Sequence, residues 1–529
     1  MAQHPIILGQ YPGDKKGDPA RVAGGKINQD FAELFAAVDN LSGLNLVAGP
    51  VTKLAPGANP TATLTGTAPN YTLNLGLPEG AAGAGAPNSA DILAIAEKGR
   101  LERALAAAGV LDEPSLILDF IRGVHFASKG AITASIMTMI TALGGVSAFS
   151  RASTGTYFDS DGLMKTAANN VPRLEYDPVS RLPRGLLMET QARTNLVTNN
   201  VSLSGIGLID VSRTANAAAS PDGTMTMSRY TSTVNGGFNT CIIDGSFTVP
   251  NDSLVRTFSG FIRQGNTPTS AINLYYTGGT FEQVVATINW STKTISGSGN
   301  PTLDDCGGGL YWFSISLANN NSGHTAVVCR VYVRDQGSAN VIGDSVDTGT
   351  WQLEVGNAKS SPIITGASAV TRAADVLTLA AGAWTSATET TLTVEFSTTV
   401  LGGILSLAEI GDGTYDNRIG TYLGGNAATI IVVSAAAVSA NLSAGAYTAG
   451  SVARLVLASK LNDFAASFAA GAVGTDSSGP MPVTAATALF VGRSSGGGAG
   501  YMGHIRRLLV YPQRLSNAKL PILSGAAWS

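Results

Sequence analysis

Short runs of β-branched and aromatic residues recur from residue 146 onward, separated by clusters of Gly, Asn, Asp and Ser. Within 325–334 the pattern alternates, with Val327, Cys329, Val331 and Val333 on one face. Regularly spaced short strands between turn signals indicate a β-sandwich or barrel. We therefore predict a mainly β chain that ends in two antiparallel β-sandwich (jelly-roll) domains, 146–378 with a leading β-segment and 379–529. The expected strands are 225–230, 241–243, 255–262, 272–276, 283–290, 310–317, 325–334 and 350–355 in the first, and 391–396, 404–410, 418–422, 430–433, 452–458, 464–468 and 488–491 in the second.

Charged residues make up only 13% of the chain, and 63 of its 529 residues are Gly. Typical globular proteins carry about 25% charged residues. Small polar residues replace the missing charge, which suits tightly turning β-structure and large subunit contacts better than the surface of a freely diffusing enzyme. The net charge of −3 provides no excess of positive charge that would attract the phosphates of a nucleic acid.

The three cysteines, Cys241, Cys306 and Cys329, form no metal-binding spacing, so we expect them to be reduced and buried. No apolar run reaches the roughly 18 residues that a membrane span needs, so membrane insertion is not expected. The segment 1–10 lacks the features of a signal peptide, and export by the ordinary route is not expected either.

Three segments precede the predicted sandwiches. In 1–43, Ile27, Phe31, Leu34, Val38 and Leu41 follow heptad spacing, which predicts a short helix that packs either on its own domain or on another copy or particle. Residues 44–87 alternate β-like runs with Gly/Pro turns. This pattern is compatible with a small β-module and with a flexible linker. Apolar blocks in 88–145 predict a helical neck, with Ser89 as its first N-cap and Gly109 as a stop.

Several segments resemble tail fibres and other virion proteins of tailed bacteriophages. The resemblance rests on FSRASTGTYFDSDG, NNVPRLEYDP and GLLMETQARTNL within 149–196, and on GDPARVAGGKINQDFAELFAAV at 17–38. Residues 351–379 resemble the exit of a carbohydrate-binding-module-like sandwich, and GYMGHIRRLLVYPQRLSNAKL resembles the last strand of a laminin-G or concanavalin-A-like jelly roll followed by a short helix. The resemblance implies a homotrimer on the virion, assembled in the host cytoplasm. Its residues 1–43 would bind other virion proteins, and its sandwiches would bind host polysaccharide.

Glycans dock on exposed aromatic rings flanked by amides and carboxylates. Of the available rings, Trp312 and Trp351 lie in apolar strand patterns and are expected in the core. Tyr415 lies on a turn-rich loop with Asp412, Asp416 and Asn417, so these four residues are the predicted glycan-binding set. No cofactor is expected, although the same loop is rich in oxygen ligands and Ca²⁺ binding there stays an alternative. Asp159 and Asp161 are expected to form an Asx turn rather than a metal site.

No catalytic motif surrounds the four histidines, and we expect no enzymatic activity. A glycosidase needs two carboxylates roughly 5–10 Å apart. Glu175, Glu189, Glu354 and Glu395 are the candidates for such a pair, but neighbouring arginines favour structural ion pairs instead. The two alternatives to a receptor-binding fibre are a structural head or collar fibre and a glycan-depolymerising tailspike.

Overall fold

A computed structural model describes residues 29, 33, 45–54, 60–67, 70–78, 89–128 and 132–525. The chain divides into two compact units, Met1–Ala96 and Glu97–Ser529, and each is described by itself. The heptad helix predicted in 1–43 lies outside the described residues, apart from two isolated helical positions. None of the described helices is long and apolar enough to cross a membrane.

The first unit contains a small three-stranded sheet in the order β1-β3-β2. Its strands are β1 (Asn45–Leu54), β2 (Thr61–Thr67) and β3 (Asn70–Pro78). β3 pairs in parallel with β1 and antiparallel with β2. This supports the β-module interpretation of 44–87 for the described part of that segment.

The predicted helical neck over 88–145 is only partly helical. Helices α2 (Ser89–Ala107) and α3 (Ile136–Leu143) match the prediction, and Gly109, at φ +97°, ends α2 in the left-handed region as expected. The prediction is wrong between the helices, where β4 (Leu116–Asp119), β5 (Val124–Ala127) and β6 (Ile132–Thr133) form strands. All four residues of β4 are buried, and such a short, wholly apolar run has no periodicity that separates a strand from a helix.

The first sandwich consists of two six-stranded sheets, β13-β16-β23-β18-β19-β20 and β14-β15-β24-β17-β22-β21. Val327, Cys329, Val331 and Val333 are completely buried between them, so the predicted alternation is confirmed. The strands are β13 (Gly207–Ile209), β14 (Val211–Ala218), β15 (Met227–Ser232), β16 (Ile242–Thr248), β17 (Val255–Gln264), β18 (Thr269–Thr277), β19 (Glu282–Asn289), β20 (Thr294–Gly297), β21 (Thr302–Asp305), β22 (Leu310–Ala318), β23 (Ala326–Tyr332) and β24 (Ser345–Val355).

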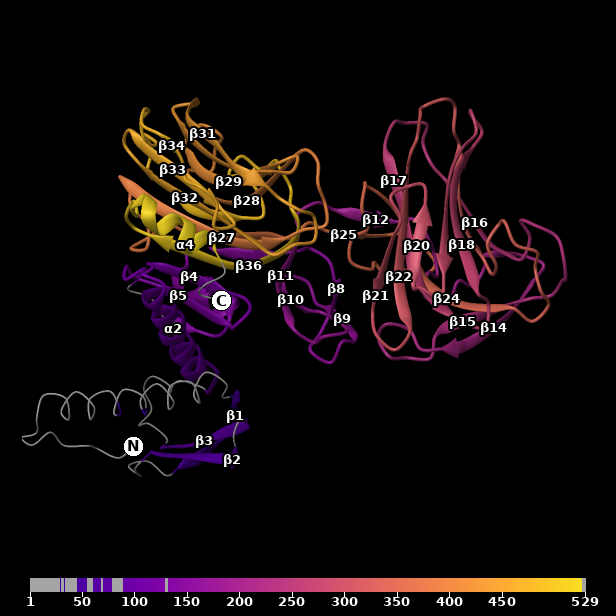
Figure 1. Ribbon diagram of the computed structural model, residues 1–529, viewed down its shortest axis with the longest axis horizontal. Coiled ribbons are helices and arrows are strands. Elements are labelled where there is room, and N and C mark those ends of the chain that lie inside the picture. Colours follow the sequence, from indigo (N-terminus) through magenta and orange to yellow (C-terminus); the bar gives the residue numbers. More distant parts are fainter. Residues whose placement is uncertain are drawn as a thin grey trace, which may run out of the picture. The chain divides into compact units, whose positions relative to one another are not determined.

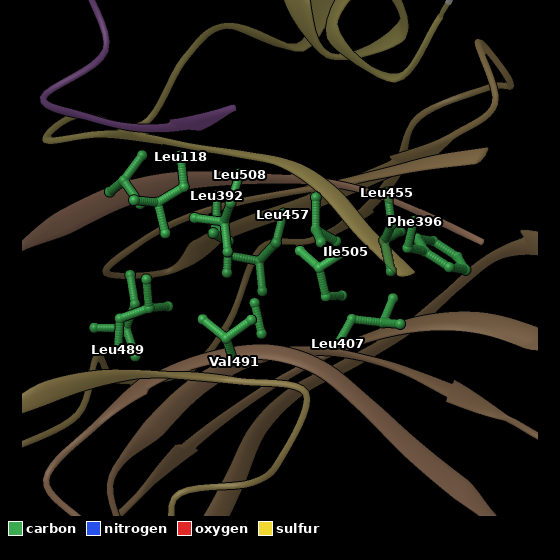
Figure 2. Close-up of a cluster of buried hydrophobic side chains, with 14 of the residues drawn as sticks. Leu118, Leu392, Phe396, Leu407, Leu455, Leu457, Leu489, Val491, Ile505 and Leu508 are labelled. Carbon is green, nitrogen blue, oxygen red and sulfur yellow. The ribbon is translucent and has the colours of Figure 1, made fainter. Parts of the chain in front are cut away.

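The second sandwich packs a seven-stranded sheet, β31-β30-β29-β28-β35-β26-β7, against a ten-stranded one. Leucine, isoleucine, valine and phenylalanine side chains from both sheets interdigitate in its core, as Figure 2 shows for Leu392, Leu457 and Val491. Twelve of its strands are β7 (Ala148–Ser150), β26 (Val376–Ala380), β27 (Glu389–Ser397), β28 (Ile404–Gly411), β29 (Arg418–Gly424), β30 (Ala427–Ser434), β31 (Ala437–Ala446), β32 (Ala453–Lys460), β33 (Asp463–Phe468), β34 (Gly474–Asp476), β35 (Ala488–Val491) and β36 (Met502–Tyr511). The ten-stranded sheet also contains β4, β5, β6, β10 (Arg173–Tyr176) and β11 (Pro183–Glu189). The short helices η1 (Asn517–Lys519) and α4 (Leu520–Ser524) follow β36, as the jelly-roll resemblance implied.

Strand β36 organises the ten-stranded sheet because it has partners from three parts of the chain (Figure 1). One of its edges pairs with β27. Its other edge pairs first with β11 (Pro183–Glu189) and then with β4. The second sandwich therefore takes strands from 116–189, which the predicted boundaries gave to the neck and to the first sandwich.

The segment 146–196 supplies the remaining strands, which are β8 (Gly155–Phe158), β9 (Met164–Ala167), β10 (Arg173–Tyr176) and β12 (Arg193–Asn195). β12 pairs with β25 (Val370–Arg372), so the segments that lead into and out of the first sandwich lie side by side.

A buried ion cluster holds this crossing point together. Glu189 accepts from Arg173 at 2.7 Å and lies 3.2 Å from the Arg372 guanidinium, while Asp375 binds Arg173 at 2.5 Å and Arg151 at 3.1 Å. All five side chains are at most 2% exposed. The five residues of this cluster are therefore structural.

Candidate glycan-binding hollow

The loop that carries the predicted site connects β28 to β29, and its polar residues hold the loop itself. Asp412 Oδ1 accepts from the Thr414 amide at 2.9 Å and from its hydroxyl at 2.6 Å, and Asp412 Oδ2 accepts from Asn417 at 3.1 Å. Asn417 Oδ1 in turn accepts from the amides of Ala435 at 3.1 Å and Val483 at 3.2 Å. The Asp412 and Asn417 side chains thus form an Asx-type framework with bonds already made.

Tyr415 is fixed in place but remains 46% exposed. Its hydroxyl accepts from the Gly498 amide at 2.8 Å, and the Arg418 guanidinium lies 5.1 Å from its ring centre. A Cβ at Gly496 would come within 2.3 Å of the ring, so only glycine lets this loop approach so closely. The ring is held in place by its surroundings rather than by its own loop alone.

Tyr415 lines an open hollow of about 600 Å³ on the seven-stranded sheet. Alternation along β29 puts Arg418 and Tyr422 on the same face of that sheet. The Tyr422 hydroxyl donates to Asn441 at 3.0 Å on the neighbouring part of the sheet. We call this site the tyrosine hollow; its lining residues are Gln191, Gly402, Gly403, Ile404, Leu405, Ser406, Tyr415, Arg418, Tyr422, Ile431, Ser494, Ala499 and Gly500.

A buried carboxylate positions the cation of the tyrosine hollow. Glu409 is 2% exposed, accepts from the Ser495 amide at 2.6 Å and pairs with Arg418 at 3.1 Å. A Cβ at Gly420 would lie only 3.0 Å from Glu409 Oε2, so glycine leaves room for this carboxylate. Arg418 Nε makes no hydrogen bond, so the guanidinium keeps donor capacity beyond its bond to Glu409.

The sequence prediction and the tyrosine hollow share Tyr415. Asp412 and Asp416 do not line the hollow, and Asn417 lines only a separate small cavity of about 30 Å³. The predicted set did not include Tyr422, Arg418 or Gln191. The alternation of Arg418, Gly420 and Tyr422 along one strand was a usable signal for the first two; nothing in the sequence places Gln191 beside them.

Several other tryptophan and tyrosine rings of the two sandwiches are buried. Trp290, Trp351, Tyr276 and Tyr501 are at most 1% exposed, which confirms Trp351 as a core residue. The prediction for Trp312 holds in part: the side chain is half-buried and packs against a small core cluster that includes Phe261, whose ring centre is 5.5 Å from that of Trp312. The Lys359 ammonium lies 4.6 Å from the Trp312 ring centre.

Three of the four candidate catalytic glutamates are enclosed by bonding partners. Burial alone would raise the pKa of Glu189, but Arg372, Arg173 and Ser361 outweigh it and hold that pKa at about 2. Glu395 receives bonds from Arg454, Arg506 and Arg507. Glu354 accepts from Ser360 and Gln352, and burial raises its pKa.

Glu175 differs because it lines a larger hollow of about 770 Å³ together with Trp312 and Lys359. Its Oε2 lies 2.7 Å from His504 Nε2. Two further ion pairs line this hollow: Asp177 binds Arg184 at 2.7 Å, and Lys359 binds Asp304 at 2.7 Å. Asp305 lines it as well and accepts from the Gly307 amide at 2.8 Å.

The predicted Asx turn at Asp159 is confirmed, because its Oδ1 accepts from the amides of Asp161 at 2.9 Å and Leu163 at 3.1 Å. Among the described residues, no group of three or more His, Cys, Asp or Glu side chains is arranged to hold a metal ion. Ca²⁺ at the Asp412 loop stays an untested prediction.

No protein-family model matches this chain, and no curated protein does either. Among solved structures, the chain is similar to the CBM40 domain of Ruminococcus gnavus IT-sialidase bound to α2,3-sialyllactose, with 17% identity over 27% of this chain and 84% of that one, at a TM-score of 0.24. It is also similar to the leech intramolecular trans-sialidase, with 16% identity over 27% of this chain and 24% of that one, at a TM-score of 0.24. Trypanosoma rangeli sialidase gives 15% identity over 26% and 22%, at a TM-score of 0.21.

Proposed function

We propose that this chain is a non-enzymatic attachment protein of a tailed-bacteriophage particle and that its tyrosine hollow binds a host-surface glycan. The observation that carries the glycan part is the combination, in one open hollow, of the Tyr415 and Tyr422 rings with the polar side chains of Arg418, Ser494 and Gln191. The phage part rests on the sequence resemblance of 17–38 and 149–196.

The chemistry of the tyrosine hollow suits a sugar. Pyranose rings present C–H faces that pack on aromatic rings, and their hydroxyls need donors and acceptors nearby. Two tyrosines supply the apolar surface, while a guanidinium, a hydroxyl and an amide supply the polar contacts. The volume of about 600 Å³ lies within the usual range for small-ligand sites.

A homotrimeric fibre would present three such hollows at once. Multivalent display raises overall avidity by roughly 10²–10⁴ without any new contact at the single site. Weak binding by one hollow would therefore be enough for adsorption to a cell. In this proposal residues 1–43 join the fibre to other virion proteins, and the assembled particle is where the protein resides.

Binding of the full-length protein to host polysaccharide tests the glycan part. Tyr422→Ala is expected to weaken binding at least about fivefold, because truncating an aromatic hot spot commonly costs more than about 1 kcal/mol. Tyr275→Ala is the matched control: it removes a half-buried tyrosine from the first sandwich and is expected to bind as the wild type does. Equal binding by wild type and Tyr422→Ala would refute the tyrosine hollow as the site.

Two further experiments separate the alternatives. Release of oligosaccharide from host polysaccharide incubated with the purified protein would contradict the non-enzymatic proposal and favour a tailspike. An image of the particle with residues 1–43 labelled distinguishes a tail fibre from a head or collar fibre. Failure of the protein to adsorb to any susceptible host would leave only the structural alternative.

A further inference from the structure

A second, smaller cavity of about 110 Å³ adjoins the tyrosine hollow. Gln191, Gly402, Leu405 and Gly500 line both, so the two form neighbouring parts of one recessed surface. The smaller cavity is also lined by Arg193 and Asn357, which lie where the chain enters and leaves the first sandwich. Glu189 lines it too, and its carboxylate is paired with Arg173 and Arg372.

Arg193 is held in position by a backbone carbonyl and by a side-chain amide oxygen. It donates to the Val355 carbonyl and, at 3.0 Å, to Gln191 Oε1, while its Nε makes no hydrogen bond. Within the described part of the chain, no Asp or Glu oxygen forms an ion pair with it. Its guanidinium lies against Gly356, where a Cβ would come within 2.8 Å, so the local backbone is shaped around it.

The surroundings of Arg193 are also cationic. Arg193 stands directly opposite Arg372 in the β12–β25 pair, an arrangement of like charges that destabilises a sheet. The ion cluster beneath it has three arginines, Arg151, Arg173 and Arg372, against the carboxylates of Glu189 and Asp375. Glu354 is the other nearby acid, and an excess of positive charge remains even when it is ionised. Burial raises the pKa of Glu354, while Ser360, Gln352 and Arg193 lower it.

We infer that this recessed surface selects a glycan bearing an anionic group, with Arg193 binding that group while the sugar rings rest in the tyrosine hollow. This inference rests on the proposed function and adds the class of ligand. A guanidinium binds carboxylate, sulfate or phosphate through charge-assisted hydrogen bonds, and the anion would offset the charge that the protein itself leaves uncompensated. Gln191 contributes to both cavities and its Oε1 orients Arg193, so it connects the two parts of the site.

Matched ligands test the inference on the full-length protein. The probes are uronic-acid-containing oligosaccharides, the same chains after reduction of their carboxyl groups, and sulfated chains as a third arm. Wild type is expected to bind an acidic form roughly 10- to 100-fold more tightly than the reduced form, the factor that one charge-assisted contact supplies. Preference for sulfated over carboxylated chains would identify the anion as sulfate and support the inference.

Variants of Arg193 provide the second half of the test. Arg193→Gln is expected to lose the preference for acidic chains while keeping its affinity for reduced ones, and Arg193→Lys to recover part of it. Arg100→Gln makes the same change in net charge at an exposed helical position of α2 and is expected to bind as the wild type does. Raised salt should weaken binding of the acidic chains and leave the reduced chains unaffected.

The outcomes separate this inference from the proposed function. Equal binding of acidic and reduced chains by wild type, or an unchanged preference in Arg193→Gln, overturns the inference and leaves glycan binding in place. Absence of binding to every chain overturns both.

Discussion

Replacing Glu189 by Gln removes one of two carboxylates from the buried cluster that joins Arg151, Arg173 and Arg372. In the wild type, the backbone amide of Ser361 donates to Glu189 Oε1 at 2.6 Å. The side-chain carbonyl of a glutamine can still accept this hydrogen bond, and the shape of the side chain is preserved. What is lost is the negative charge between two arginines that have almost no access to water. Because unpaired buried charge is costly, we expect Glu189→Gln to destabilise the fold strongly.

The magnitude follows from the pKa. Burial by itself raises the pKa of Glu189, but Arg372, Arg173 and Ser361 outweigh burial and hold it at about 2, against an ordinary value of 4.5. This difference corresponds to about 3 kcal/mol of folding free energy when the group is ionised. Removing one member of a buried pair costs about 3–5 kcal/mol in other proteins, which agrees.

The sign of the pH dependence is fixed by the direction of this shift. A carboxyl whose folded pKa is depressed contributes its full stabilisation above its unfolded pKa and loses it as the pH falls toward the folded value. We therefore expect wild type to exceed Glu189→Gln by about 3 kcal/mol above roughly pH 5, and the two to converge as the pH approaches about 2.

Urea unfolding followed by circular dichroism at pH 7, 4 and 3 measures this difference. Glu97→Gln is the control, because Glu97 forms an exposed pair with Arg100 at 2.9 Å, and such pairs contribute at most about 1 kcal/mol. A cost below about 1 kcal/mol for Glu189→Gln, or a cost that does not change with pH, would refute the reasoning.

Three further outcomes are expected. Gly496→Ala should displace the Tyr415 ring, which a Cβ would approach within 2.3 Å, and should weaken glycan binding while costing about 1–3 kcal/mol in stability; unchanged binding would argue against a positioned ring. Leu508→Ala should cost about 2–5 kcal/mol in urea unfolding, because Leu508 is fully buried in the second core; a loss well under 1 kcal/mol would place it outside the cooperative core. Cys241, Cys306 and Cys329 are all buried, and burial raises the pKa of the Cys306 thiol to about 12 and that of Cys329 as well. A thiol reagent at pH 8 should therefore label no cysteine in the native protein and all three in urea. Rapid labelling of the native protein would contradict the buried positions found for Cys241, Cys306 and Cys329.

Sequence periodicity predicted the inner strands of both sandwiches because those strands carry large apolar residues on their buried faces. It missed β14 and β31, which are edge strands in which small and polar residues predominate and most side chains are exposed or half-buried. It also took β4 for part of a helix, since LILD is buried at every position. In each case the pattern expected of a half-buried strand is absent from the residues themselves.

The tyrosine hollow was only partly predictable for a different reason. The turn-forming residues around Tyr415 identified its loop as a candidate site. The same residues explain why Asp412 and Asn417 do not line the hollow, because their side-chain oxygens accept hydrogen bonds that stabilise the loop. The other lining residues come from 191, 402–406, 418–431 and 494–500. Only the pairing of strands distant in sequence brings these segments together, and no local pattern encodes that pairing.

The position of β36 has a consequence for how the protein is made. Its partners β4 and β11 leave the ribosome early, whereas β36 itself comes after the whole of the first sandwich. The first sandwich can close while synthesis continues, but the early strands must wait with unpaired edges, and unpaired edges invite association with other chains. A ribosome that stalls before residue 502 would release a chain whose ten-stranded sheet lacks the strand that β4, β11 and β27 share. The ten-stranded sheet of the second sandwich can therefore close only after β36 has been synthesised.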